Sequence, residues 1–326
     1  MTNNRPIVLV SGATGFVGRY LLAVLEREGW AVRPAVRRPS GLQNEAVIGS
    51  IGRETDWRAG LNGVDAVVHL AARVHHPNDR DAEDLYRDLN VDGTLQLARS
   101  AIEAGVKHFV LASTALVYGR NTALVYGRNN DGLPPFSEDD ELTPQNPYSR
   151  SKVEAEAGLK SLAEGHPMSV TVVRPPLVYG AGAKGNFALL VRAAKLGVPL
   201  PFAAIENRRA FVSVQNLSSF IASRLSAAGG GYEIFLVADE EQVSTPEFFR
   251  RLAKAAGGEA RLVRVPAPLL SGLLTISGRG EARQSLIGSL ELNIAKALSR
   301  GWRPPLTLDE GLRLALAGHG CDAPGS

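Results

Sequence analysis

The sequence predicts an α/β fold in which helices cover both faces of a doubly wound parallel sheet. Short apolar runs alternate with helical patterns through the first half of the chain, as they do where helices connect parallel strands. A glycine-rich turn joins the first apolar run, Ile7–Val10, to the first helical pattern. Further along, Tyr148 and Lys152 lie four residues apart and would share one face of a helix.

Length and composition set the class of protein. With 326 residues, the chain can bury a large core and form one large domain or two. Its net charge is only +3, and basic and acidic residues are mixed, so we expect neither a nucleic-acid nor a membrane partner. One cysteine, Cys321, and the lack of a signal-peptide or membrane-spanning pattern predict a cytoplasmic protein without an internal disulfide.

Three glycines follow the first predicted strand. Gly12, Gly15 and Gly18 have the spacing G-x-x-G-x-x-G, and a helical pattern begins directly after them. This order of strand, glycine turn and helix brings backbone N–H groups to a pyrophosphate at a helix N-terminus. The stretch therefore predicts a dinucleotide site, whereas a simple turn would not need three glycines at that spacing.

The end of the second predicted strand, Ala31–Val36, indicates which dinucleotide binds. Chains that select NAD usually place a carboxylate there to hold the ribose 2′-hydroxyl. Here Arg37 and Arg38 follow the strand, and a guanidinium suits a 2′-phosphate. We predict NADP with Arg37 as the main selector; the alternative is that both arginines are solvated loop residues.

Further strands follow at 47–49, 64–70, 108–113 and 169–173, with a helical stretch at 82–104. His69 is expected to pack or to form a hydrogen bond rather than to catalyse. His75-His76 has no second cluster of ligands nearby, so no metal site is expected. Asn90 lies in the middle of the predicted helix and, if buried, needs a polar partner such as a water or a backbone group.

Hydroxyls follow the 108–113 strand, at the end where ligands of parallel sheets bind. Ser113 and Thr114 are the first of them. The eight residues 114–121 are then repeated without change as 122–129, too short a period for a structural repeat. Because the first copy follows the strand directly, we expect Thr114 rather than Thr122 to serve the site, and the second copy to bulge outward.

Tyr148 and Lys152 can carry acid–base chemistry. A phenol has a reference pKa near ~10, and an ammonium one turn away favours the phenolate. Such a pair can move a proton to or from a hydroxyl or a ketone. The alternative, two side chains on a solvated helix face, would apply if no other part of the chain agreed.

The second half of the chain departs from strict alternation. Helices are expected at 148–164, 185–196 and 215–227, an extended segment at 210–214, and a strand at 232–237 that rejoins the sheet. Thr245 is the expected N-cap of a further helix, with Pro246 at its first position. The apolar stretch 266–276 is expected to form the core of a small second domain.

Together these motifs resemble the extended short-chain dehydrogenase/reductase family, in its NAD(P)-dependent nucleotide-sugar epimerase, dehydratase and reductase branch. The resemblance rests on the glycine turn, His69-Leu-Ala-Ala72, Asn90-Val-Asp-Gly-Thr94, Ser113–Gly119, and Tyr148 with Lys152. It implies a Rossmann-type sheet of about seven strands and a small interleaved C-terminal α/β substrate domain. The implied division is 1–174 with 210–238 returning to it, 175–209 with 239–318, and a frayed tail at 319–326.

The resemblance also implies roles for residues. Tyr148 is the acid/base, Lys152 lowers its pKa and holds the nicotinamide ribose, and Thr114 bonds the sugar oxygen. Asn186 and Arg209 match positions that hold the nucleotide and its diphosphate. The implied cofactor-binding residues are Gly12, Thr14, Gly15, Phe16, Val17, Gly18, Arg37, Ser50, Ile51, Leu70, Ala71, Ala72, Asn90, Ser113, Tyr148, Lys152 and Pro175. Ser50 departs from the family, which usually has an aspartate there.

The leading functional hypothesis is reduction of a UDP-4-keto-hexose or hexosamine at C4 by NADPH. A finer match at Gly185-Asn-Phe187, Pro199-Leu-Pro201, Asn207-Arg-Arg209 and Gly288-Ser-Leu290 resembles bacterial O-antigen enzymes of that kind. The runner-up is a UDP-glucose or UDP-N-acetylglucosamine 4-epimerase, which recycles a tightly held NAD. A third hypothesis is a non-catalytic dinucleotide-binding protein, which the repeat beside the site would explain. Related enzymes are often homodimers.

Overall fold

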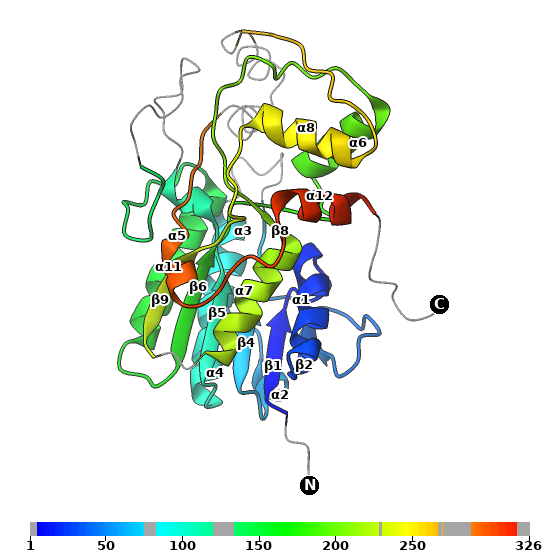
Figure 1. The fold of residues 1–326 in the computed structure, drawn as a ribbon. Coiled ribbons are helices and arrows are strands. Elements are labelled where there is room, and N and C mark those ends of the chain that lie inside the picture. Colours follow the sequence, from blue (N-terminus) through cyan, green and yellow to red (C-terminus); the bar gives the residue numbers. More distant parts are fainter. Residues whose placement is uncertain are drawn as a thin grey trace.

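The computed structural model describes residues 5–74, 83–119, 134–227, 230–266, 269 and 288–317. Seven strands form one sheet in the order β3-β2-β1-β4-β5-β6-β9, and every neighbouring pair is parallel. The strands are β1 Ile7–Ser11, β2 Ala31–Val36, β3 Ala46–Val47, β4 Ala66–His69, β5 His108–Ala112, β6 Ser169–Arg174 and β9 Tyr232–Leu236. The predicted Rossmann-type sheet is confirmed, including the return of the last strand beside β6 (Figure 1).

Helices cover both faces of this sheet because successive strand residues point to opposite sides. Val8 and Val10 face the layer that contains α1 (Phe16–Arg27) and α7 (Val214–Ser226). Leu9 faces the other layer, built from α2 (Arg58–Leu61), α4 (Gly93–Glu103) and α5 (Pro147–Ala163). All three side chains are buried, so the continuous apolar runs predicted from the sequence are those of a sheet covered on both sides.

The predicted long helix at 82–104 is interrupted. It contains α3 (Glu83–Tyr86), a π-helical turn η1 (Arg87–Asp92) and then α4. Within the turn, the Asn90 side chain bonds the backbone of Arg73, and its carbonyl accepts from the Thr94 hydroxyl. These bonds compete with the regular hydrogen bonds of an α-helix. Hydrophobic periodicity does not reveal such bonds, so the sequence alone predicted one continuous helix.

A smaller lobe lies beyond the carboxyl ends of the strands (Figure 1). It contains a two-stranded parallel sheet, β7 (Leu177–Tyr179) with β8 (Phe211–Ser213), and an aromatic core. Its helices are α6 (Asn186–Leu196), α8 (Thr245–Ala255) and α12 (Leu308–Leu316), whereas α11 (Ala295–Ser299) packs near β9. Ser244, not Thr245, is the N-cap of α8, because its hydroxyl accepts from the Glu247 N–H. The division into domains stays a prediction.

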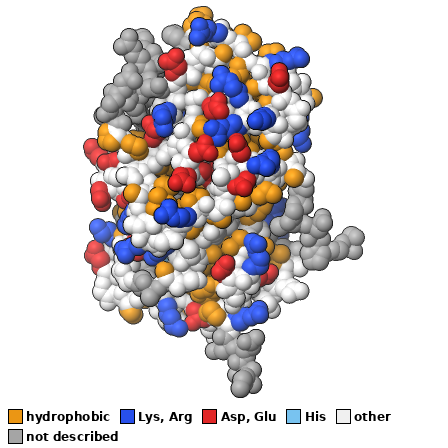
Figure 2. Space-filling model, in the orientation of Figure 1, with side chains coloured by type: hydrophobic (Ala, Val, Ile, Leu, Met, Phe, Trp, Pro, Cys, Tyr) orange, Lys and Arg blue, Asp and Glu red, His pale blue; other side chains and the backbone are white. Residues whose placement is uncertain are grey.

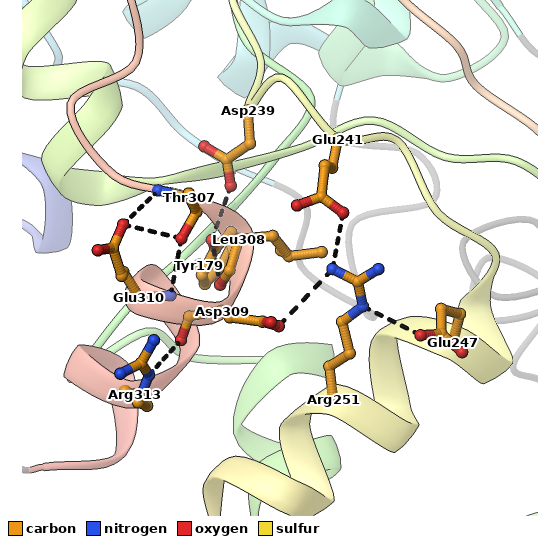
Figure 3. Close-up of polar contacts among 10 residues, drawn as sticks. All are labelled: Tyr179, Asp239, Glu241, Glu247, Arg251, Thr307, Leu308, Asp309, Glu310 and Arg313. Atoms are coloured by element: carbon orange, nitrogen blue, oxygen red, sulfur yellow. Dashed lines mark hydrogen bonds and ion pairs between the residues drawn. The ribbon is translucent and has the colours of Figure 1, made fainter.

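A buried hydrogen bond and an ion-pair network connect segments of the lobe (Figure 3). The Tyr179 hydroxyl donates to the buried carboxylate of Asp239 at 2.7 Å. On α8, the Arg251 guanidinium lies between Glu247 of the same helix, Glu241, and Asp309 on α12. Helices α8 and α12 are therefore joined by an ion-pair network around Arg251.

Acidic and basic side chains are interspersed on the face shown in Figure 2. Among the described residues, no helix has the length and apolar character needed to cross a bilayer, and no three His, Cys, Asp or Glu side chains are grouped as metal ligands. Several predictions fall outside the described residues: those on His75-His76, the second copy of the repeat, most of 266–276, and the tail.

Candidate active site

The glycine turn after β1 is shaped so that backbone can approach a ligand. Gly12 has φ +72°, and a Cβ there would lie 2.8 Å from the backbone nitrogen of Ala71. At Gly18 a Cβ would lie 2.3 Å from the Gly12 carbonyl oxygen. Gly15 is the N-cap of α1 and supplies no side-chain cap, and the first turn contains no acidic residue. The N-terminal N–H groups of α1 can therefore bind an anion.

A buried hydrogen-bond chain supports this turn from below. The Ser11 hydroxyl bonds His69 Nδ1 at 2.6 Å, and His69 Nε2 bonds the Thr94 hydroxyl at 3.0 Å. Because Thr94 donates its own proton to the Asn90 carbonyl, we assign the Nε2–H tautomer to His69. Burial lowers the pKa of His69 to about 3, so the ring is neutral and structural, in the role the sequence predicts.

The sheet register brings the predicted site residues to one edge. Ser11 pairs with both Ala35 and His69, and Ala112 pairs with Val173. The residues that follow these strand ends therefore lie along the same edge of the sheet, where ligands of parallel sheets bind. They are Gly12 after β1, Arg37 after β2, Leu70, Ala71 and Ala72 after β4, Ser113 and Thr114 after β5, and Pro175 after β6.

Tyr148 and Lys152 lie in the first half of α5. Asn146 caps this helix through a capping box with Ser149, and Pro147 occupies its first turn. Lys152 is 1% exposed, and burial lowers its pKa to about 8 while Glu156 opposes that shift. The alternative interpretation of the sequence, in which Lys152 lies on a solvated helix face, is therefore wrong.

Desolvation raises the pKa of Tyr148 to about 12, and Tyr86 adds to the increase. Lys152 is not among the causes of this shift, so the lowering of the Tyr148 pKa by Lys152 stays a prediction. With its pKa raised by burial, Tyr148 is a protonated phenol at neutral pH.

Asn90 connects the π turn η1 to the helix that carries Tyr148. Its Nδ2 donates to the Arg73 carbonyl and to the Ser151 hydroxyl, which in turn donates to the Tyr148 carbonyl. The predicted need for a partner is met by backbone and by a hydroxyl. Since Asn90 also accepts from the Arg73 N–H, its amide is committed to positioning these segments.

The two hydroxyls after β5 have different surroundings. Ser113 Oγ donates to the Glu156 carboxylate and lies away from solvent. Thr114 is the N-cap of η2 (Ala115–Tyr118), where its Oγ1 accepts from the Leu116 N–H. An accepting hydroxyl still has its own proton to donate. Of these two residues, Thr114 therefore suits a substrate oxygen better, while Ser113 is part of the scaffold.

The predicted cofactor selectors follow the end of β2. Arg37 and Arg38 are exposed, and the next carboxylate, Glu45, bonds the Ser40 hydroxyl and backbone within its own loop. Ser50 is exposed and its carbonyl accepts from Thr55. A Cβ at Gly93 would lie 2.7 Å from the Ile51 side chain, so helix α4 packs closely under this loop.

The two substrate-binding predictions lie in the smaller lobe. Asn186 is the first residue of α6 and is half-buried. Arg209 is 4% exposed, and its guanidinium donates to the Gly288 carbonyl. Its backbone pairs with both Val243 and Leu290, so it stands where three segments of the lobe meet. A role on a diphosphate stays a prediction for both residues.

Sequence reasoning missed the buried ion pair between Glu156 and Arg174, whose Nη2 and Oε2 atoms are 2.6 Å apart. The signal was present, because Glu156 stands four residues after Lys152 and continues the face that begins at Tyr148. Arg174 ends β6 and also donates to the Tyr118 hydroxyl. The ion pair joins α5 to the end of β6, and Arg174 extends the contact to η2.

Residues 8–238 match the model of the NAD dependent epimerase/dehydratase family. The chain belongs to this family. It is 37% identical to a UDP-glucose 4-epimerase of Vibrio cholerae over 94% of this chain and 93% of the relative. It is 26% identical to a GDP-6-deoxy-D-mannose reductase of Pseudomonas aeruginosa over 95% and 96% of the two chains.

A solved structure described as MoeE5 in complex with UDP-glucuronic acid and NAD has a TM-score of 0.76, with 25% identity over 95% of this chain and 97% of that one. Structures of this fold contain NAD in some cases and NADPH in another. As a family member, the protein is an enzyme of the NAD-dependent nucleotide-sugar 4-epimerase and reductase group.

The residues present fit a dinucleotide cofactor. The glycine turn leaves space that a Cβ would fill, and the N-terminus of α1 has no side-chain cap. In this family member, Gly12, Gly15 and Gly18 would hold the pyrophosphate, and Lys152 would hold the nicotinamide ribose. The nicotinamide, when bound, supplies or accepts a hydride.

Proposed function

We propose that the protein is an NADPH-dependent reductase that acts at C4 of a UDP-linked 4-keto-hexose or hexosamine. The observation that carries this proposal is the end of β2, where Arg37 and Arg38 are exposed and Glu45 is bound within its own loop. A guanidinium there favours a 2′-phosphate by a charge-assisted bond. NADPH is the usual donor for net reduction.

The protonation state of Tyr148 also supports reduction of the sugar rather than its oxidation. Reduction of a ketone produces an alkoxide at C4, which needs a proton. With its pKa raised to about 12, Tyr148 is protonated at neutral pH and donates that proton. Thr114, which follows β5, bonds the same sugar oxygen. Lys152 stabilises the phenolate that Tyr148 becomes.

We assign the nucleotide of the substrate to the smaller lobe. In this proposal Asn186, at the start of α6, bonds the nucleotide, and the Arg209 guanidinium bonds the diphosphate. The 37% identical relative named as a UDP-glucose 4-epimerase supports UDP as the nucleotide. We place the enzyme in the cytoplasm, in line with its single cysteine, and a homodimer is consistent with the resemblance.

A 4-epimerase is the second candidate, and the same relative favours it. An epimerase first oxidises the C4 hydroxyl, so it needs the tyrosinate form of Tyr148 and a retained NAD. The reductase consumes NADPH in each turnover instead.

Mass spectrometry of ligands co-purified with the protein separates the two candidates. The reductase predicts exchangeable cofactor and oxidation of added NADPH by UDP-4-keto sugars; stoichiometric bound NAD would contradict it. For Arg37→Asp, we expect kcat/KM with NADPH to fall at least ~tenfold relative to NADH, since a bidentate guanidinium contact is lost. Arg38→Asp is the matched control, expected to change this ratio less.

A further inference from the structure

The Glu156 carboxylate accepts from two partners, at the ends of two different strands. It lies on α5, one turn after Lys152 and two turns after Tyr148, and is 3% exposed. Arg174, at the end of β6 and 2% exposed, contacts it through Nη2 at 2.6 Å and through Nε at 3.2 Å. Ser113, after β5, donates its hydroxyl to the other carboxylate oxygen. One carboxylate thus holds the acid–base helix against two strand ends.

The arginine extends this contact to the loop that contains Thr114. Its Nη1 donates to the Tyr118 hydroxyl, and its guanidinium lies 5.0 Å from the centre of the Tyr118 ring. Tyr118 ends η2, the turn that Thr114 caps, and it stacks on Phe136. Thr114 is therefore flanked by Ser113 and Tyr118, both bound to the same ion pair.

Burying two full charges is expensive, and apolar side chains of the same size often give equal or greater stability. The stability gained from the pair therefore does not by itself explain its place between α5 and the strand ends. Glu156 is also the carboxylate nearest in sequence to Lys152 on the shared face of α5, and its negative charge favours the Lys152 ammonium against burial. The other titratable groups around Lys152 are the neutral ring of His69 from β4, Tyr148 one turn earlier on α5, Tyr86 of α3 beside Tyr148, and Arg174 of β6 beside Glu156.

We propose that Glu156 and Arg174 are positioning residues for the reaction: together they set the separation between the Thr114 hydroxyl and the Tyr148–Lys152 pair, and the buried Glu156 carboxylate, one helical turn from Lys152, is the counter-charge of its ammonium. Neither residue touches the reacting atoms. The proposal deepens the proposed function and rests on it for the reaction that is assayed. It does not depend on the choice between reduction and epimerisation, because both need these three side chains in place.

The charge role is tested with Glu156→Gln, which keeps the size of the side chain and removes its charge. We expect the basic limb of the pH profile of kcat/KM to move down by about one pH unit, because the Lys152 ammonium loses its buried counter-charge. The matched control is Glu233→Gln, which removes the carboxylate of another, partly buried ion pair, Arg224–Glu233, between α7 and β9. That control should lose comparable stability and keep the wild-type profile.

The positioning role is tested with Glu156→Asp, which keeps the charge and withdraws the carboxylate by one methylene group. We expect kcat to fall at least ~tenfold with an unchanged basic limb, because small misplacements of reacting groups are costly. The proposal is overturned if Glu156→Asp leaves kcat unchanged and Glu156→Gln leaves the basic limb of the kcat/KM profile at its wild-type pH. A limb that moves equally in Glu233→Gln also overturns it, since the effect would then be one of general destabilisation.

Cofactor binding gives a readout that needs no substrate. The pH dependence of NADPH affinity, followed by its fluorescence, should show the same downward shift in Glu156→Gln, because Lys152 holds the nicotinamide ribose. If wild-type protein binds NADPH but converts no UDP-sugar, the proposed function fails while this measurement still decides the role of Glu156. A binding profile identical in wild type and Glu156→Gln would count against the charge role.

Discussion

Asn90 Nδ2 lies 2.9 Å from the Ser151 hydroxyl oxygen, and this bond attaches a π-helical turn to the helix that carries Tyr148. The Ser151 hydroxyl in turn donates a hydrogen bond to the Tyr148 carbonyl. Glu156 holds the same helix at its middle through Arg174. Two independent contacts thus fix the helix before any ligand binds, so substitutions at the acid–base residues should change chemistry more than structure.

Tyr148→Phe should abolish turnover and leave cofactor binding nearly unchanged. The variant removes the proton donor but keeps the ring, and general acid catalysis contributes about 10²- to 10⁴-fold to a rate. The measurement is kcat with UDP-4-keto sugars beside the Kd for NADPH. Wild type and variant that are equally inert over a panel of UDP-sugars would contradict the acid–base role.

Thr114→Val should lower kcat/KM by about 10- to 100-fold, and Thr114→Ser should recover most of the loss. Valine keeps the shape but cannot bond a sugar oxygen, and one hydrogen bond to a developing charge is worth about 1.5–3 kcal/mol. Ser113→Ala is the informative comparison. Since Ser113 bonds Glu156, its effect should appear as a loss of stability as well as of activity.

Stability should fall as the pH drops from about 6.5 towards 4. Burial lowers the pKa of His69 to about 3 and that of His108 to about 4, below the ordinary 6.5. The unfolded chain therefore binds more protons in this window, and each histidine lowers the free energy of unfolding by about 2–3 kcal/mol by pH 4.5. Urea denaturation at pH 7.5 and 4.5 measures this.

His108→Gln should reduce that acid sensitivity, because the amide can still bond Thr171 and does not titrate. His166→Gln changes an exposed histidine and serves as the control. Equal pH dependence in both variants would refute the assignment to buried histidine.

Tyr179→Phe should lower the free energy of unfolding by about 1–3 kcal/mol, because it removes a donor from the buried Asp239 carboxylate. Asp239 keeps two donors, the Ser213 N–H and the Asn216 amide. Arg313→Ala on the exposed side of α12 should change stability by less than about 0.5 kcal/mol. Chemical denaturation of both variants makes the comparison; a Tyr179→Phe protein as stable as wild type would show that the hydroxyl is dispensable.

The strands and the glycine turn could be predicted because local pattern determines them. Buried parallel strands are continuous apolar runs, and only glycine tolerates the φ of Gly12 beside the Ala71 backbone. Tyr148 and Lys152 were found for the same reason, since their spacing matches one helical turn.

The features that could not be predicted from the sequence depend on contacts between distant segments. The π turn forms because Asn90 finds the backbone of Arg73, 17 residues away. The direction of the Tyr148 pKa shift depends on how much water the folded chain excludes, which spacing alone does not reveal. Likewise, Glu156 resembled an ordinary helix carboxylate until the fold placed Arg174 against it.

The main chain enters the smaller lobe twice. It leaves the sheet after β6, returns through α7 to form β9 beside β6, and leaves again towards α8 and α12. No single cut can excise the lobe, and no single insertion can graft it onto another sheet. A chimera that exchanges the lobe with that of a relative would therefore require three matched crossovers, one at each passage between sheet and lobe, and a single crossover would also exchange the last strand of the sheet or mix lobe segments from the two parents.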